Sequence, residues 1–192
     1  MTLLILGLVL FLGVHSVRVF AEGWRVGVRA RLGEGVYKGV YTLASVVGLV
    51  LIVWGYGLAR QQPELLWLPP VWTRHLAALL TVPAFILLVA AYVPGNSIKA
   101  KVHHPMVLSV KVWALAHLLS NGMLADVLLF GGFLVWAVLI FRAARQRDRA
   151  GQISYPVGRM GPTLVAVAVG LVAWAGFALW AHGVVIGVRP FG

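Results

Sequence analysis

The stretch TLLILGLVLFLGVHSVRVFA, which spans Thr2–Ala21, decides the class of fold. An apolar segment of about 20 residues crosses the ~30 Å hydrocarbon core of a bilayer when it forms a helix. We therefore predict an all-α, polytopic integral membrane helix bundle of about six transmembrane helices, which forms a single domain over residues 1–192. The other predicted spans, in chain order, are Tyr41–Ala59, Trp72–Val93, Pro105–Leu119, Leu124–Phe141 and Pro162–His182. Of these, Pro105–Leu119 is short.

The composition of the whole chain agrees with a membrane location. Apolar residues make up 61% of the sequence and charged residues 11%, which is outside the usual range of soluble domains. No Lys or Arg precedes the first apolar run, and the small-residue cleavage pattern after it is poor. We therefore interpret Thr2–Ala21 as a retained helix and not as a signal peptide.

Basic residues outnumber acidic residues, 16 to 5, and gather in alternate loops between the apolar segments. Short cytoplasmic loops carry an excess of Lys and Arg, so we predict that both termini lie on the non-cytoplasmic side. This placement argues against nucleic acid as a partner and favours membrane lipid, whose anionic headgroups the loop RAARQRDRA would contact. The basic residues of the predicted cytoplasmic loops are Arg25, Arg29, Arg31, Lys38, Lys99, Lys101, Arg142, Arg145, Arg147, Arg149 and Arg159.

Two of the six histidines, His15 and His117, lie within apolar sequence, where ionisable groups are rare and often functional. The chain has no cysteine, so any metal must be held by histidine, carboxylate or carbonyl groups. For each of these two histidines, the alternative is a structural hydrogen bond between helices. The other four lie near segment ends, where we expect interfacial structural roles: His75, His103, His104 and His182.

A haem b iron suits His15 and His117, because neutral imidazoles from two helices can bind it axially while apolar helix surfaces enclose the macrocycle. Zinc and di-iron sites need three or four ligands that include carboxylates, and we expect none of the five acidic residues inside a span. The predicted topology places His15 nearer the cytosolic side and His117 nearer the opposite side. A tilted macrocycle accommodates this difference in depth.

Neighbours of the two histidines are candidates for cofactor binding. Arg18 follows His15 by three residues on the same helical face, where it would pair with a haem propionate. Trp113 lies on the face of His117 and would flank the porphyrin edge. Asn121, one turn beyond His117, would orient the imidazole through its second ring nitrogen.

Lys111 and His104 are candidates at the basic end of the same site. Lys111 lies about two turns into the short segment, on the face of His104 and not on that of His117. Its ammonium group either extends along its apolar stem to the cytosolic surface or approaches a propionate if the helix tilts.

Small residues and one proline bear on how the predicted helices pack. Glycines at a helix surface allow the backbones of two helices to approach closely. Pro83, inside a predicted span, is expected to kink its helix. The glycines that we predict at close helix contacts are Gly48, Gly55, Gly57, Gly131 and Gly132.

Several motifs resemble the NnrU family of bacterial membrane proteins. They include RARLGEGVYKGVYTLASVVGLVLIVWGY, the HHP at His103–Pro105, the WALAH at Trp113–His117 and the closing HGVVIGVRP, so the resemblance runs nearly the length of the chain. It implies a multi-pass protein of the bacterial inner (cytoplasmic) membrane that is linked to denitrification and nitric oxide metabolism.

A more distant branch of that family is the plant and cyanobacterial 15-cis-zeta-carotene isomerase, a haem b enzyme of the membrane. The resemblance to its motifs implies that His15 and His117 are iron ligands and that His104 matches a further histidine that precedes proline. Ala114 stands where the isomerase has a cysteine that is a suggested alternate ligand. Ligand switching through a thiol is therefore not expected here.

Three functions remain open. The first is a haem b protein of the NnrU type with redox, nitric-oxide-related or isomerase-like chemistry, which would act on nitric oxide or on a lipophilic polyene or quinone. The second is an electron carrier in which both histidines stay bound to iron. The third is a cofactor-free assembly factor or small transporter with structural histidines. The sequence identifies no catalytic residue.

Overall fold

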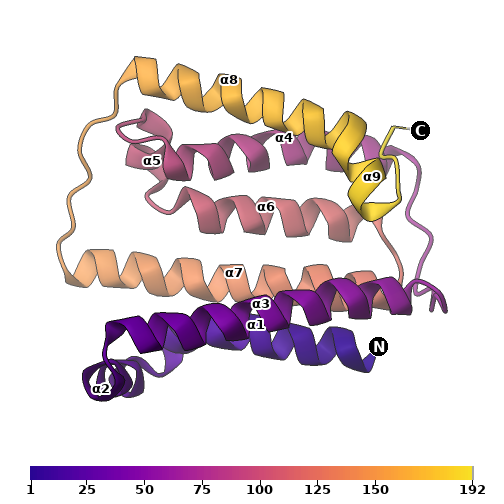
Figure 1. The fold of residues 1–192 in the computed structure, drawn as a ribbon. Coiled ribbons are helices and arrows are strands. Elements are labelled where there is room, and N and C mark those ends of the chain that lie inside the picture. The colour runs from indigo at the N-terminus through magenta and orange to yellow at the C-terminus, as the bar shows by residue number, and fades with distance from the viewer. Residues whose placement is uncertain (192) are drawn as a thin grey trace. The chain divides into compact units, whose positions relative to one another are not determined.

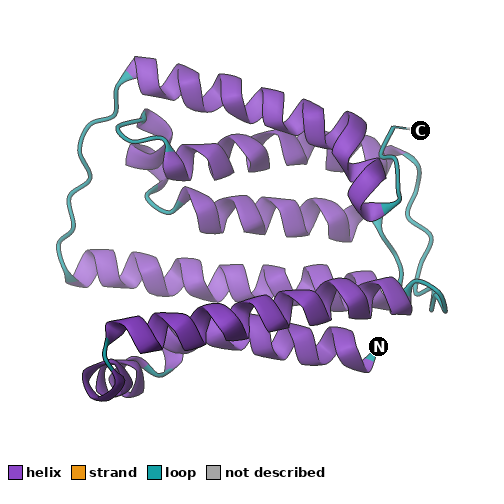
Figure 2. Ribbon diagram, in the orientation of Figure 1, coloured by secondary structure: helices purple, strands orange, loops and turns teal. Residues whose placement is uncertain are grey.

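The computed structural model describes residues 1–191, and its regular elements over that range are helices (Figures 1 and 2). Five helical runs among these residues are long and apolar enough to cross a membrane: α1 (Thr2–Phe20), α3 (Glu34–Ala59), α4 (Trp72–Tyr92), α7 (Leu124–Ala150) and Met160–Ile186. The last run joins α8 (Met160–Gly176), the π-helical turn η1 (Phe177–Ala181) and α9 (His182–Ile186). The short predicted span is α6 (Pro105–Ser120), with 16 residues. The all-helical, multi-pass prediction is confirmed, whereas the number of spans and the side of the termini stay predictions.

Two shorter helices occupy regions that the sequence analysis treated as loops. α2 (Glu22–Leu32) follows α1 directly and buries none of its residues. α5 (Ser97–Val102) begins after Asn96, whose side-chain oxygen accepts a hydrogen bond from the Lys99 amide at 2.7 Å. This is an N-cap, which satisfies a backbone donor that the helix itself leaves unpaired. Asn96 is 1% exposed, so the cap lies within the protein interior.

Contacts between residues divide the chain into two compact units. The first unit comprises residues 1–68 and 122–136, and so contains α1, α2, α3 and the first half of α7. The second unit comprises residues 69–121 together with the chain from Ala137 onward, which includes α4, α5, α6, α8 and the rest of α7. The prediction of a single domain stays a prediction.

In the first unit, glycines bring α3 against the backbone of α1. A Cβ atom added at Gly48 would lie 2.9 Å from the backbone nitrogen of Phe11, and one added at Gly55 would collide with the α1 backbone. The prediction of close approach is confirmed for these two residues. It is wrong for Gly57 and Gly131, where an added Cβ would meet no heavy atom within 4 Å.

The start of α7 is anchored in the same unit. The Tyr56 hydroxyl donates to Asp126 at 2.6 Å, and the Met123 amide donates to the same carboxylate at 3.1 Å. Asp126 is 4% exposed and lies in the first turn of α7, so the expectation that no carboxylate lies inside a span is wrong here. Further along, Gly132 lies beside Leu12 of α1, although only side-chain atoms approach it.

In the second unit, α4 contacts both α6 and α8. A Cβ atom added at Gly170 of α8 would lie 2.7 Å from the Cα atom of Ile86, which shows how closely the two backbones approach. Trp174 donates from its indole nitrogen to the Thr81 hydroxyl at 3.0 Å. This bond lies less than one turn before Pro83, which is inside α4 as the sequence predicts. The two contacts hold α8 antiparallel to α4.

Candidate functional site

His15 lies in the first unit, on α1, and is surrounded by aromatic rings. Its Nδ1 atom lies 2.7 Å from the carbonyl oxygen of Phe11, four residues earlier. The centroid of its ring is 4.3 Å from that of Phe11, 5.2 Å from that of Tyr41 and 6.4 Å from that of Trp136. Aromatic residues of α1, α3 and α7 thus pack around a single imidazole.

Trp136 adds a polar group to these surroundings. Its indole nitrogen is buried and has no hydrogen-bond partner among the described residues. Its ring meets that of His15 at an interplanar angle of 84°. A buried donor without a partner costs free energy, so this N–H group is available to a ligand that would enter beside His15. From the sequence, Trp136 is expected to belong to an interfacial belt of tryptophans near segment ends, because a tryptophan within an apolar helix carries no pattern that separates packing from binding.

His117 lies in the second unit, on α6. Its Nδ1 atom is 2.9 Å from the carbonyl oxygen of Trp113, again four residues earlier, and the two rings are 5.2 Å apart. The Asn121 side chain donates to the backbone carbonyl of His117 at 2.8 Å. The bond that we expected Asn121 to make with the imidazole is therefore made by the Trp113 carbonyl, because Asn121 is occupied with capping the C-terminal end of α6.

The two Nδ1 bonds fix the chemistry of both rings in the same way. A carbonyl oxygen only accepts hydrogen bonds, so each Nδ1 atom must carry the proton. In a neutral imidazole, the lone pair that binds a metal is then on Nε2. Metal-bound histidines commonly donate their other N–H group to a backbone carbonyl, which fixes the tautomer and the ring orientation. His15 and His117 share this arrangement, each within its own unit.

The remaining candidates have distinct surroundings. Arg18 lies in the last turn of α1 and is exposed. The ammonium nitrogen of Lys111 lies 4.9 Å from the ring centroid of Phe141 on α7, in a cation–π contact. The structure therefore gives Lys111 a partner within the protein. The joint ligation of one iron by His15 and His117 stays a prediction, because the two residues belong to different units.

His104 belongs to a separate polar cluster of the second unit. Its Nε2 atom lies 2.7 Å from Oδ2 of Asp148, and the Tyr155 hydroxyl donates to the same oxygen at 3.0 Å. Nδ1 of His103 lies 3.9 Å from that oxygen. Burial and the neighbouring Asp148 carboxylate raise the pKa of the Tyr155 phenol, so the hydroxyl remains a donor. The Nε2 atom of His104 is thus already engaged, and its predicted role in cofactor binding stays untested.

The backbone at His103 is strained. Its φ is 69° and its ψ is −49°, and the amide of His104 donates to the carbonyl of Val102 at 2.9 Å. These values and this bond define a γ-turn centred on His103. Such a conformation costs of order 1–3 kcal/mol and persists where the surrounding structure imposes it, often at binding sites.

Sequence reasoning did not identify Asp148 and Tyr155 as partners of His104. Asp148 was assigned to a solvated loop, but it lies near the C-terminal end of the helix α7, beyond the predicted span that ends at Phe141. His104 lies 44 positions before Asp148, and Tyr155 lies seven positions after it outside any regular helix, so no local motif links the three residues. Among the described residues, no group of three or more His, Asp or Glu side chains is placed to hold a metal ion.

Comparison with known proteins gives one result. The family model described as NnrU protein matches residues 3–190, nearly the whole chain. No significant match exists among curated proteins or among solved structures. The match includes both compact units and every candidate residue described above. The chain therefore belongs to the NnrU family.

Proposed function

We propose that the protein binds haem b within the bilayer and that His15 and His117 would hold its iron. The observation that supports this most directly is the shared hydrogen bond from Nδ1 to a backbone carbonyl, which leaves Nε2 as the ligating nitrogen of a neutral ring. The absence of cysteine and of a three-residue carboxylate–histidine group in the described chain favours haem over a site made of protein ligands alone.

The surroundings of the two histidines fit a macrocycle. Phe11, Tyr41 and Trp136 offer π surfaces beside His15, and Trp113 does so beside His117. The partnerless indole N–H of Trp136 would donate to a propionate or to a polar ligand on the iron. When bound, haem supplies one-electron exchange and a coordination position for a small molecule or a polyene.

The proposed chemistry is redox, nitric-oxide-related or isomerase-like, in the inner membrane of a bacterium that handles nitrogen oxides. The protein residues would orient the imidazoles, exclude water from the iron and donate one hydrogen bond from Trp136. Family membership supports this assignment. If one of the two histidines exchanges, a small ligand such as nitric oxide or carbon monoxide binds, whereas a pure electron carrier keeps both bonds and reacts slowly.

The test is an absorption spectrum of detergent-purified protein, produced with adequate haem supply, in the oxidised and the dithionite-reduced state. The wild type should show a Soret band and sharp reduced bands. His15→Ala and His117→Ala should each lose or shift these bands, because each removes one axial ligand. His75→Ala is the matched control, because this exposed histidine lies in the first turn of α4 and is not expected to change the spectrum.

Two outcomes would contradict the proposal. A colourless wild-type protein would mean that His15 and His117 serve only in helix packing, as in a cofactor-free assembly factor or small transporter. Unchanged bands in both single variants would assign the haem to other ligands. The Nδ1 bonds within α1 and α6 are compatible with the packing role as well, which is why the spectrum and not the geometry decides between the two functions.

A further inference from the structure

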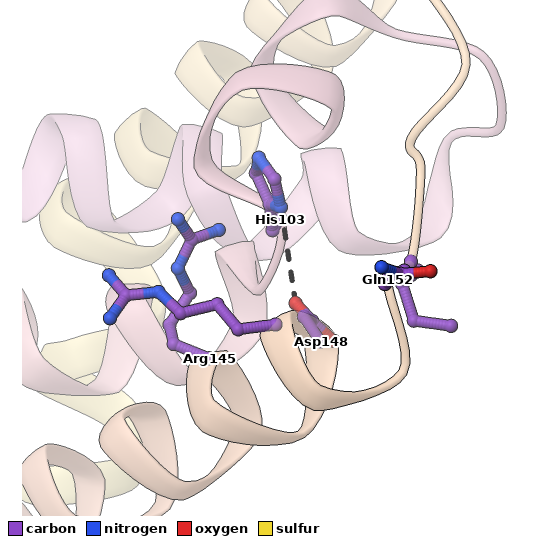
Figure 3. A pocket seen from close by; sticks show the side chains of 6 residues that line it. His103, Arg145, Asp148 and Gln152 are labelled. Atoms are coloured by element: carbon purple, nitrogen blue, oxygen red, sulfur yellow. Dashed lines mark ion pairs between the residues drawn. The ribbon is translucent and has the colours of Figure 1, made fainter.

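A pocket in the second unit lies at the basic end of α7 (Figure 3). Its volume is about 170 Å³, and it is largely open to solvent. His103 reaches it from the turn before α6, Arg145 and Asp148 from α7, and Gln152 from the segment that follows α7. The complete lining is His103, Arg145, Asp148, Arg149, Gln152 and Ile153.

The charge of this pocket favours an anion. Neither Arg145 nor Arg149 makes a side-chain hydrogen bond or ion pair within the part of the chain that the structure describes. The one carboxylate in the lining, Asp148, already accepts hydrogen bonds from His104 and Tyr155 at Oδ2. Arg145 and Arg149, which lie one turn apart on α7, thus line the pocket with no hydrogen-bond or ion-pair partner among the described residues, and guanidinium groups bind phosphate oxygens through paired N–H donors.

His103 supplies a second and independent sign of a ligand. Its Nδ1 atom is buried and has no hydrogen-bond partner among the described residues. His103 also has the strained backbone of the γ-turn described above, and its ring packs 4.1 Å from that of Tyr155. Burial and the nearby Arg145 charge lower the pKa of His103, an effect that Asp148 only partly offsets. A bound anion beside the ring would raise the pKa of His103 and so oppose the effect of Arg145.

We propose that this pocket binds a phosphate group, which Arg145 and Arg149 hold through their guanidinium groups and which His103 and Gln152 approach with N–H donors. The site is separate from the proposed haem ligands and does not depend on them. α7 is long and apolar enough to cross a membrane, and its last two turns carry Arg145 and Arg149, so the pocket lies at the basic end of a candidate span, as expected for a lipid–water boundary. The phosphate then comes from the headgroup of an anionic lipid or from a soluble phosphorylated compound.

The test measures binding to the purified full-length protein in a neutral detergent. One probe is phosphatidylglycerol, detected as retained lipid by native mass spectrometry, with phosphatidylcholine as the comparison lipid. The other probe is inorganic phosphate, detected by broadening of its ³¹P resonance. Replacing both Arg145 and Arg149 by Gln should weaken binding about tenfold or more, because two charge-assisted contacts are lost.

Arg147→Gln is the matched control, because it removes the same charge from the same helix turn but lies outside the pocket lining. It should change binding by less than about twofold, as expected for a screened surface charge. Asp148→Asn should strengthen binding, because it removes the one negative charge from the pocket while it keeps an acceptor oxygen. An increase in affinity also shows that the variant is folded.

Each result of these binding measurements either supports phosphate binding at the pocket or overturns it. Retention of phosphatidylglycerol over phosphatidylcholine, lost in the Arg145 and Arg149 variant, supports a lipid headgroup as the source. Binding of inorganic phosphate with the same sensitivity but without lipid retention supports a soluble source. Equal weakening by Arg147→Gln would show that only general surface charge acts, and no binding of either probe to the wild type would likewise overturn the proposal.

Discussion

Asp126 and Asp148 lie on the same helix, α7, and each accepts a hydrogen bond from a tyrosine, Tyr56 in the first unit and Tyr155 in the second. Their other partners differ. Asp126 is 4% exposed and otherwise accepts the Met123 amide. The Asp148 side chain is 16% exposed and is surrounded by histidines and arginines. One carboxylate closes a backbone turn, and the other organises titratable groups at an open pocket.

The comparison teaches that burial of a carboxylate does not by itself indicate function. The Asp126 bonds are short and involve a phenol and a backbone amide, groups that stay neutral near pH 7. Asp148 accepts from His104 and Tyr155, lies 3.9 Å from Nδ1 of His103, and its charge acts to raise the pKa of His103. Substitutions at Asp126 should therefore affect stability alone, and those at Asp148 should affect stability, pH response and ligand binding together.

The largest effect is expected from Gly55→Leu, which acts on the region that positions Tyr56 for Asp126. A Cβ at this position collides with the backbone of Leu4, and backbone atoms cannot move aside as a side-chain end can. We expect a loss of at least about 3 kcal/mol in unfolding free energy or no folded protein. The yield and elution profile of the purified protein report this. Gly57→Leu, next to open space, should behave as wild type; equal damage from both would contradict the packing described here.

Asp126→Ala should have the next largest effect. It leaves the Tyr56 hydroxyl and the Met123 amide without an acceptor in a buried place, which costs about 1–3 kcal/mol per lost partner. Unfolding by a denaturing detergent, followed by circular dichroism, gives the change. Asp126→Asn keeps an acceptor oxygen and should therefore lose less unfolding free energy than Asp126→Ala. If both variants lose the same free energy of unfolding, the negative charge of Asp126, and not its hydrogen bonds, stabilises the contact between α3 and α7.

Asp148→Ala should cost less, about 1 kcal/mol, because its more exposed surroundings let water replace part of the lost bonds. A double-mutant cycle with Tyr155→Phe isolates the hydrogen bond between the two side chains. We expect the coupling free energy between Asp148 and Tyr155 to be smaller than the one measured by the matching cycle between Asp126 and Tyr56. The reverse order of the two couplings would refute the assignment of Asp126 as the structural member of the pair.

The smallest effect concerns pH. The pKa of His103 is held below its ordinary value of 6.5, chiefly by burial and then by the charge of Arg145. As the pH falls below 6.5, the unfolded chain binds a proton before the folded protein does, so stability declines until His103 is also protonated in the fold. The charged or titratable neighbours that face it are Arg145, Asp148, His104 and Tyr155.

His103→Asn should flatten this decline, since Asn does not titrate and tolerates a positive φ. The measurement compares the unfolding midpoints of the two proteins at about pH 7.5 and about pH 5.5. The difference between the two pH values should be smaller in the variant. An identical pH response would mean that groups other than His103 account for the acid sensitivity of the wild type.

Hydropathy predicted the apolar parts of the fold well and the polar parts poorly. The first residues of α1, α4 and α7 are those of the predicted spans. The end of α7 was missed because the segment after Phe141 is polar, and a search for apolar runs stops there. That segment, RAARQRDRA, is nonetheless helical, because Ala, Arg and Gln are strong helix formers.

The candidate site was predictable only where its geometry is local. The bonds of His15 to Phe11 and of His117 to Trp113 join residues four apart, so they follow once a histidine is placed on a helix. The bond between His104 and Asp148 joins residues 44 positions apart and depends on how α6 packs against α7. The γ-turn at His103 carries no sequence signal either, since histidine before His-Pro does not specify a positive φ.

The length of α7 has a consequence for the membrane itself. Its 27 residues make a rod of about 40 Å at ~1.5 Å per residue, longer than the ~30 Å hydrocarbon core and close to the thickness of a bilayer with its headgroup layers. The rod has a carboxylate in its first turn and another near its last. Only the part of the rod before Arg142 is apolar, and this part matches the length of the hydrocarbon core. In a bilayer, the basic turns that follow would therefore continue the same helix through the headgroup layer and carry its charges beyond the lipid tails.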